Sequence, residues 1–150
     1  MNETLLTFLI SMVPVIELRG AIPYGVAAGL PIFTAAIVSV IGNIIPAPFI
    51  IIFIRKIIAI MKKMSKTVQK FAEWLERKAE KNKEKVLKYE FWGLMLLVAV
   101  PLPGTGAWTG ALVAAMLDMQ LKRALPAIVV GVIVAGIVVS LATMGVVATV

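Results

Sequence analysis

The stretch VPVIELRGAIP, residues 13–23, decides how this chain must fold. It carries Glu17 and Arg19, the two charged residues of the otherwise apolar segment 5–30. An ionisable side chain at bilayer depth costs at least about 2.5–3.5 kcal/mol on insertion scales. Prolines and a glycine flank the two charges, and both residue types interrupt helices. The pattern predicts a broken membrane helix built around a polar site.

The composition is that of an integral membrane protein. The 150 residues are 61% hydrophobic and 15% charged, with a mean hydropathy of +1.00, whereas soluble domains are about 45–50% apolar and about 25% charged. The absence of cysteine excludes disulfides and thiolate metal sites, and the absence of histidine removes the commonest general base. We therefore expect no enzyme activity, no cofactor and no metal site. The net charge of +7 is concentrated in a few segments, so it reports topology rather than nucleic-acid binding.

The apolar segments occur in the same order twice: a short one, a break, a second short one and a long one. Each break begins with Val-Pro, at residues 13–14 and 100–101, and Gly-Ala follows at 20–21 and 106–107. Weak internal similarity of this kind is typical of transporter repeats. The sequence predicts an all-α integral membrane fold with an inverted-topology repeat, each half a re-entrant helical hairpin plus a transmembrane helix. We expect repeat 1 at residues 1–61 (hairpin 5–30, transmembrane helix 31–54) and repeat 2 at residues 91–150 (hairpin 91–119, transmembrane helix 124–147).

The distribution of basic residues favours re-entrant hairpins over full crossings. Apart from Arg19, every lysine and arginine lies within residues 55–88 or at Lys122 and Arg123. Basic residues of short loops stay in the cytoplasm. If the short segments crossed the membrane, the two basic groups would end on opposite sides, whereas hairpins leave both groups inside and both termini outside. We expect a multi-pass protein of a prokaryotic plasma membrane.

The charged segment 62–90 predicts a cytoplasmic amphipathic helix. Val68, Phe71 and Leu75 fall at helical spacing along it. A basic amphipathic helix can bind anionic lipid, so membrane lipids are expected partners. The alternative is a solvated connector that only fixes the topology.

The two breaks form the candidate binding site. Non-helical backbone at membrane depth is tolerated only where it is buried in protein or lines a cavity. Helix ends there offer N–H groups to anions and carbonyl groups to cations. We expect the two tips, residues 17–23 and 101–110, to meet near the bilayer midplane. The candidate substrate- or ion-binding residues are Glu17, Arg19, Asn43, Gly104, Thr105, Gly106, Trp108 and Thr109.

Three of these residues carry open alternatives. Glu17 is a candidate proton carrier, with Arg19 as its partner or as an anion contact; the alternative is an ion-pair network that only stabilises the hairpin. Desolvation favours the neutral carboxyl group of Glu17 and a neighbouring arginine favours the charged one, so the sequence leaves its protonation state open. Asn43, in the middle of the long segment 31–54, either contributes to the site or forms a hydrogen bond between helices.

At these residues the chain resembles the small multi-drug export protein family. The resemblance rests on VPVIELRGAIP (13–23) and PLPGTGAW (101–108) and covers nearly the whole chain. The chain is more distantly similar to the DedA/VTT superfamily, whose members have two re-entrant hairpins, the first with an acidic residue that Glu17 would match. The second hairpin of those proteins carries an arginine, which this sequence lacks between residues 90 and 122. Arg19 would replace that arginine from the other hairpin.

These features lead to a transporter hypothesis. We expect a small exporter of small compounds, cationic ones among them, coupled to protons or ions and with its site between the two tips. One alternative is a DedA-like translocase of lipid or polyprenyl phosphate, and another is a non-transporting membrane scaffold. Two hairpins bury their polar tips poorly alone, so a homodimer is expected.

Overall fold

Helices make up all the secondary structure in the part of the chain that the structure describes. The computed structural model describes residues 2–102, 105–117 and 119–150, and for residues 55, 79 and 82–89 it describes the backbone alone. The helices are α1 (Glu3–Met12), α2 (Glu17–Ala27), α3 (Ile32–Ile44), α4 (Pro46–Lys62), α5 (Lys66–Tyr89), α6 (Phe91–Ala99), α7 (Ala107–Met116) and α8 (Leu121–Thr149).

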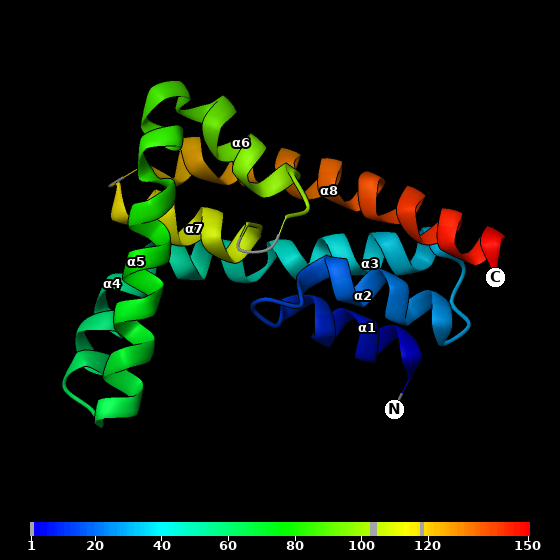
Figure 1. Cartoon of the computed structure of the whole chain (residues 1–150), viewed down its shortest axis with the longest axis horizontal. Coiled ribbons are helices and arrows are strands. Elements are labelled where there is room, and N and C mark those ends of the chain that lie inside the picture. Colours follow the sequence, from blue (N-terminus) through cyan, green and yellow to red (C-terminus); the bar gives the residue numbers. More distant parts are fainter. Residues whose placement is uncertain (1, 103–104, 118) are drawn as a thin grey trace.

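Within these described residues, two segments are long and apolar enough to cross a membrane: Ile32–Ile54, with 23 residues, and Leu121–Thr149, with 29. At about 1.5 Å per residue they extend about 35 and 44 Å, against about 30 Å for the hydrocarbon core. α8 runs the length of the molecule and α3 runs beside it in the opposite direction (Figure 1). The first segment is interrupted where α3 ends and α4 begins, because Pro46 and Pro48 lack the amide hydrogen that a continuous helix needs.

After these prolines, α4 turns away from the bundle and forms an arm with α5 (Figure 1). α4 continues to Lys62, beyond the expected end of the transmembrane helix at residue 54. A salt bridge of 2.8 Å joins Lys62 Nζ to Glu76 Oε1 across the arm. α5 also packs against α6 and α7, and Ala72 in its N-terminal half is fully buried. One face of the charged helix is therefore covered by protein.

Two pairs of short helices lie at opposite ends of the bundle (Figure 1). α1 and α2 pack on each other and on α3, while α6 and α7 contact each other and α6 packs along α8. These helices have 10, 11, 9 and 10 residues, which gives about 14–17 Å at about 1.5 Å per residue, half of the hydrocarbon thickness. Each helix pair reaches only the middle of the molecule, where their inner ends meet.

The first break lies earlier in the chain than the sequence predicted. The predicted tip at residues 17–23 is wrong, because Glu17 begins α2 and Pro23 lies inside that helix. The chain turns at residues 13–16, where Pro14 precedes Val15 with φ of 78°. A single proline removes one helical hydrogen bond and can be accommodated, whereas a left-handed residue next to a proline changes the chain direction.

The second break is shorter than predicted. α6 ends at Ala99 and α7 begins at Ala107, so the predicted tip at 101–110 includes the first turn of α7. Trp108 and Thr109 therefore project from a helix rather than from a loop.

Small residues let the helices approach closely around these breaks. A Cβ atom on Gly131 of α8 would lie 2.7 Å from Cβ of Val98 in α6, and one on Gly136 would lie 2.7 Å from Cγ2 of Val40 in α3. α8 therefore packs directly on both halves of the molecule.

Candidate substrate site

The carboxylate of Glu17 lies at the start of α7, in the other pair of short helices. Its Oε1 accepts a hydrogen bond from the backbone N–H of Trp108 at 3.0 Å, and the side chain is 3% exposed. The first amides of a helix have no partner within the helix, and the helix dipole favours an anion there. Glu17 therefore caps α7 from a position 91 residues earlier in the chain.

Gly106 allows this close approach. Its φ of 124° and ψ of −175° fall in a region that essentially only glycine adopts. A Cβ atom at this position would collide with the carboxylate oxygens of Glu17. The glycine is thus required both by the backbone conformation and by the neighbouring carboxylate.

Arg19 caps the opposite end of the same break. Its Nη2 donates to the carbonyl oxygen of Val100 at 3.2 Å and to Thr105 Oγ1 at 2.8 Å, and its Nη1 donates to the carbonyl oxygen of Leu102. These groups follow the end of α6, where backbone carbonyl groups lose their helical partners. The basic residue therefore lies where the helix dipole favours a cation. The Thr105 hydroxyl reinforces the turn, since its Oγ1 lies 2.6 Å from the carbonyl oxygen of Val100.

Trp108 makes a third connection, in the reverse direction. Its indole Nε1 donates to the carbonyl oxygen of Met12, the last residue of α1, at 3.0 Å. Each break is therefore closed by side chains of the other helix pair. We call this set of contacts the cross-caps: Glu17 on α7, Arg19 after α6 and Trp108 on α1.

The turn that presents Glu17 is strained. Val15 has φ of 78° and Glu17 has φ of 49°. Positive φ is a clear outlier for a β-branched residue such as valine, and such conformations cost of order 1–3 kcal/mol each. They persist only where the surroundings fix them, and the cross-caps supply that restraint.

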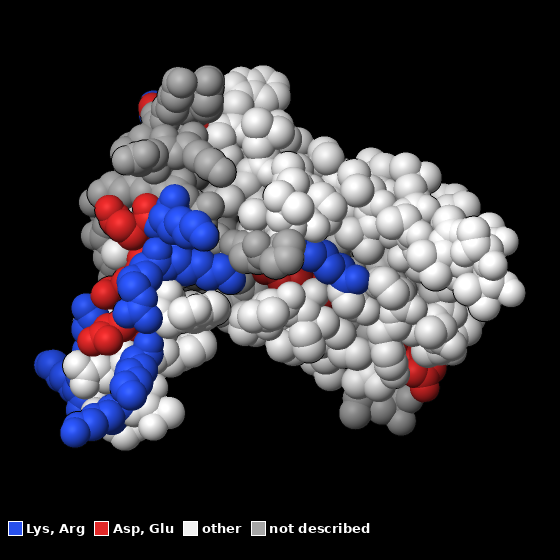
Figure 2. Space-filling view, in the orientation of Figure 1, with Lys and Arg blue, Asp and Glu red and all other residues white. Residues whose placement is uncertain are grey.

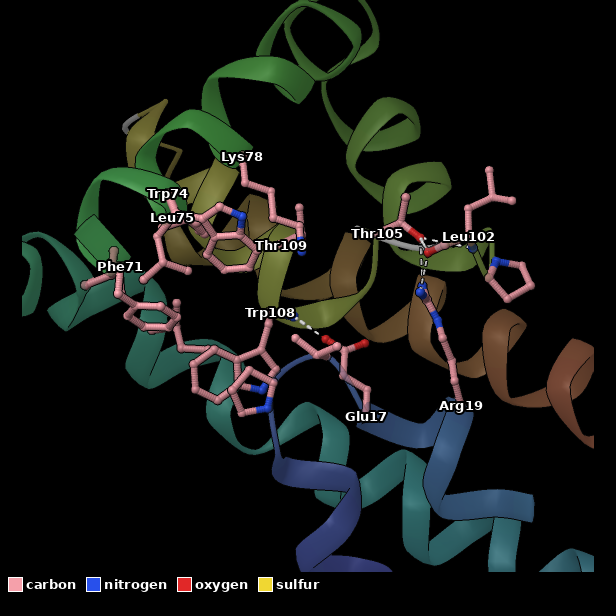
Figure 3. A pocket seen from close by; sticks show the side chains of 16 residues that line it. Glu17, Arg19, Phe71, Trp74, Leu75, Lys78, Leu102, Thr105, Trp108 and Thr109 are labelled. Atoms are coloured by element: carbon pink, nitrogen blue, oxygen red, sulfur yellow. Dashed lines mark hydrogen bonds between the residues drawn. The ribbon is translucent and has the colours of Figure 1, made fainter. Parts of the chain in front are cut away.

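A cavity of about 790 Å³ lies beside the cross-caps (Figure 3). The two tips form one side of it with the side chains of Glu17, Arg19, Thr105, Trp108 and Thr109, and most of the remaining wall is apolar. Ligand sites typically measure about 300–1,000 Å³ and combine apolar walls with a few polar groups. The cavity is of the right size and character for a small amphiphilic molecule.

The arm forms the other side of the cavity, a contribution that the sequence did not predict. α5 contributes Phe71, Trp74, Leu75 and Lys78 to the wall, and α4 contributes Ile50 and Ile54. The spacing of these α5 residues puts them on one helical face. This spacing is the feature of the sequence from which the lining face of α5 could have been predicted. Basic residues gather along the outside of the arm (Figure 2).

Comparison with known proteins places the chain in a family. The family described as "Putative small multi-drug export protein" matches residues 17–138, from the first cross-cap to α8. The chain belongs to this family. No curated protein and no solved structure matches it, and the similarity to DedA proteins stays a prediction.

The description of this family names an export function. Together with the two long apolar helices, it indicates a membrane protein.

The predicted site residues of this export-family protein divide into three groups. Glu17, Arg19, Thr105, Gly106 and Trp108 meet at the cross-caps, and Thr109 lies beside them in the cavity wall. Asn43 lies apart from the cavity, 2% exposed on α3, and its Oδ1 has no hydrogen-bond partner among the described residues. Gly104 lies outside the described residues.

Proposed function

We propose that this protein exports small amphiphilic compounds through the cavity between the tips and the arm, with Glu17 as the coupling site. The observation that carries the proposal is the position of an ionisable group that both lines the cavity and holds the two tips together. A substrate and a proton would thus act on the same contact.

The proposal includes the membrane arrangement expected from the sequence. The two short helix pairs would be re-entrant hairpins that enter from opposite sides, related as an inverted repeat, with the arm in the cytoplasm. The helix lengths and the placement of the pairs at opposite ends of the bundle (Figure 1) support this arrangement. The cross-caps also satisfy backbone groups that would otherwise be unpaired at membrane depth, a requirement for broken helices there.

The coupling step follows from the cap on α7. The side chain of Glu17 interacts more strongly with the N-terminal amides of α7 while it is charged. Protonation would remove this charge, weaken the cap and allow the tips to separate. Separation of the tips would expose the cavity to the opposite side of the membrane, and deprotonation would restore the cap.

Transport into proteoliposomes under an imposed pH gradient tests this proposal. A panel of small aromatic compounds of either charge would identify a transported probe. We expect Glu17→Gln, which keeps the size of the side chain but cannot release a proton, to reduce gradient-driven uptake of that probe to the level of empty liposomes.

Glu3→Gln is the matched control, because Glu3 lies exposed on α1 away from the cavity. It should transport like the unmodified protein. Gradient-driven uptake that persists in Glu17→Gln would reject Glu17 as the coupling site.

A second candidate is translocation of a phosphate-bearing lipid. It is favoured by Arg19 and Lys78, two basic side chains in an otherwise mostly apolar cavity wall. A flipping assay with a fluorescent phospholipid separates the two candidates: flipping without transport of small solutes supports the lipid, and the reverse supports the exporter.

A further inference from the structure

We infer that the cavity selects amphiphiles with an anionic head group, and that Lys78 of α5 is the residue that recognises this head. The inference rests on the proposed function in one respect, namely that this cavity is the substrate site. It departs from the cationic substrates that the sequence of the tips suggested.

The acidic residue of the cavity is already engaged by the protein. Glu17 is 3% exposed and its carboxylate faces the start of α7, where it accepts from the Trp108 amide and lies against Gly106. In Figure 3 the Glu17 side chain points toward the backbone of Trp108. A cationic head would have to compete with the helix terminus for this carboxylate.

The basic residues give the cavity wall its net charge. Among the described residues, the charged side chains of the wall are Glu17, Arg19 and Lys78, which together carry a net charge of +1 when all three are ionised. Arg19 is held in place by its hydrogen bonds to the turn after α6. Lys78 extends from the arm toward Thr109 in the wall of the cavity (Figure 3).

The surroundings of Lys78 suit an amphiphile. Its Nζ lies 4.8 Å from the ring centroid of Trp74, a cation–π contact, and Trp74 stacks on Phe71 with their centroids 5.7 Å apart. The aromatic pair lines the cavity together with Ile54. A ligand with its apolar body against these side chains would place its head next to the ammonium group. Because the wall is mostly apolar, water screens the charge of the head weakly.

The tryptophans allow a direct binding experiment. The chain has three tryptophans, and two of them, Trp74 and Trp108, line the cavity. In a Trp92→Phe background, energy transfer from these two to a dansyl group reports occupancy in purified, detergent-solubilised protein. Three probes share the dansyl body and differ in the head: a sulfonate, a neutral amide and a trimethylammonium group.

We expect the sulfonate to bind at least about tenfold more tightly than the trimethylammonium probe, the ratio that about 1.4 kcal/mol produces. Lys78→Gln should remove most of this preference and Lys78→Glu should reverse it. Lys81→Glu is the matched control, because Lys81 is exposed on the same helix and outside the cavity wall, and it should leave the preference unchanged. Circular dichroism of each variant checks that the fold is retained.

Equal or tighter binding of the trimethylammonium probe, or an unchanged preference in Lys78→Glu, would overturn the inference. Such a result would leave the exporter proposal standing if Glu17→Gln still abolished transport. Anion-selective binding without transport would support the inference and reject the exporter proposal. The two failures are therefore distinguishable.

Competition by lipids identifies the natural source of the head group. Displacement of the sulfonate probe by phosphatidylglycerol, but not by phosphatidylcholine, indicates an anionic lipid. Displacement by neither indicates a small soluble amphiphile, and both results agree with an anionic head. Equal displacement by both lipids would contradict selection by charge.

Discussion

The two pairs of short helices contribute different groups to the same contact. The α1–α2 pair supplies both charges, Glu17 and Arg19, from the start of α2. The α6–α7 pair supplies the helix ends that these charges cap, together with the indole of Trp108. The two halves suggested by the sequence therefore differ in their chemical groups. One half carries the charged side chains, and the other carries the helix ends that these side chains cap.

This division explains how two charges are accommodated among apolar helices. Residues two apart on a helix do not face each other, and Glu17 and Arg19 instead reach opposite sides of one break. Each charge meets a helix terminus of opposite sign. A charge-assisted hydrogen bond is about twice as strong as a neutral one, so each cap offsets part of the cost of burying its charge.

Gly106→Ala should have the largest effect, because it breaks the contact from the side that carries no charge. The substitution forces an alanine into a conformation that essentially only glycine adopts, which costs of order 1–3 kcal/mol. It also pushes a methyl group into the carboxylate of Glu17. With the loss of the cap, we expect a destabilisation of about 4 kcal/mol, from backbone strain, overpacking and capping together.

Unfolding in detergent micelles measures this effect, and Gly29→Ala is the control. Gly29 also has positive φ, 96°, but nothing lies within 4 Å of a Cβ atom there. Gly29→Ala should lower the free energy of unfolding by only about 1–2 kcal/mol, the strain of a left-handed residue. Equal effects of the two substitutions would mean that the contact with Glu17 contributes nothing.

Arg19→Gln should have the next largest effect, about 2 kcal/mol, because it removes charge-assisted hydrogen bonds to three acceptors of the second break. A double-mutant cycle with Thr105→Val should give a coupling of about 1 kcal/mol, since residues in direct contact are not additive. Thermal unfolding of the four proteins measures it.

Arg123→Gln serves as the control for this cycle. Arg123 is exposed and its closest approach to Glu90 is 4.0 Å, and exposed ion pairs contribute little, about 0–1 kcal/mol. Additive effects of Arg19→Gln and Thr105→Val would show that Arg19 does not act through the Thr105 hydroxyl.

The sequence predicted the composition of this contact better than its geometry. The high cost of charge in a membrane identified Glu17 and Arg19, and the proline and glycine residues identified both breaks to within a few residues. The partners of the charges lie more than 80 positions away, and no local pattern encodes which helix end meets which side chain. Lys78 and Trp74 were missed for a related reason, because the spacing of α5 residues defines a face but not what that face packs against.

Trp108→Phe should have the smallest effect of the series, and it tests whether the cross-caps work in both directions. Phenylalanine keeps the aromatic body but cannot donate to the carbonyl oxygen of Met12. We expect a loss of about 0.5–1.5 kcal/mol, the net contribution of one neutral hydrogen bond, whereas Trp92→Phe, at an exposed position with 63% of the residue accessible, should be close to neutral. If both substitutions are neutral, the hydrogen bond from Trp108 to Met12 does not contribute to stability. The stabilisation between the two helix pairs then comes from Glu17 and Arg19 of the α1–α2 pair alone.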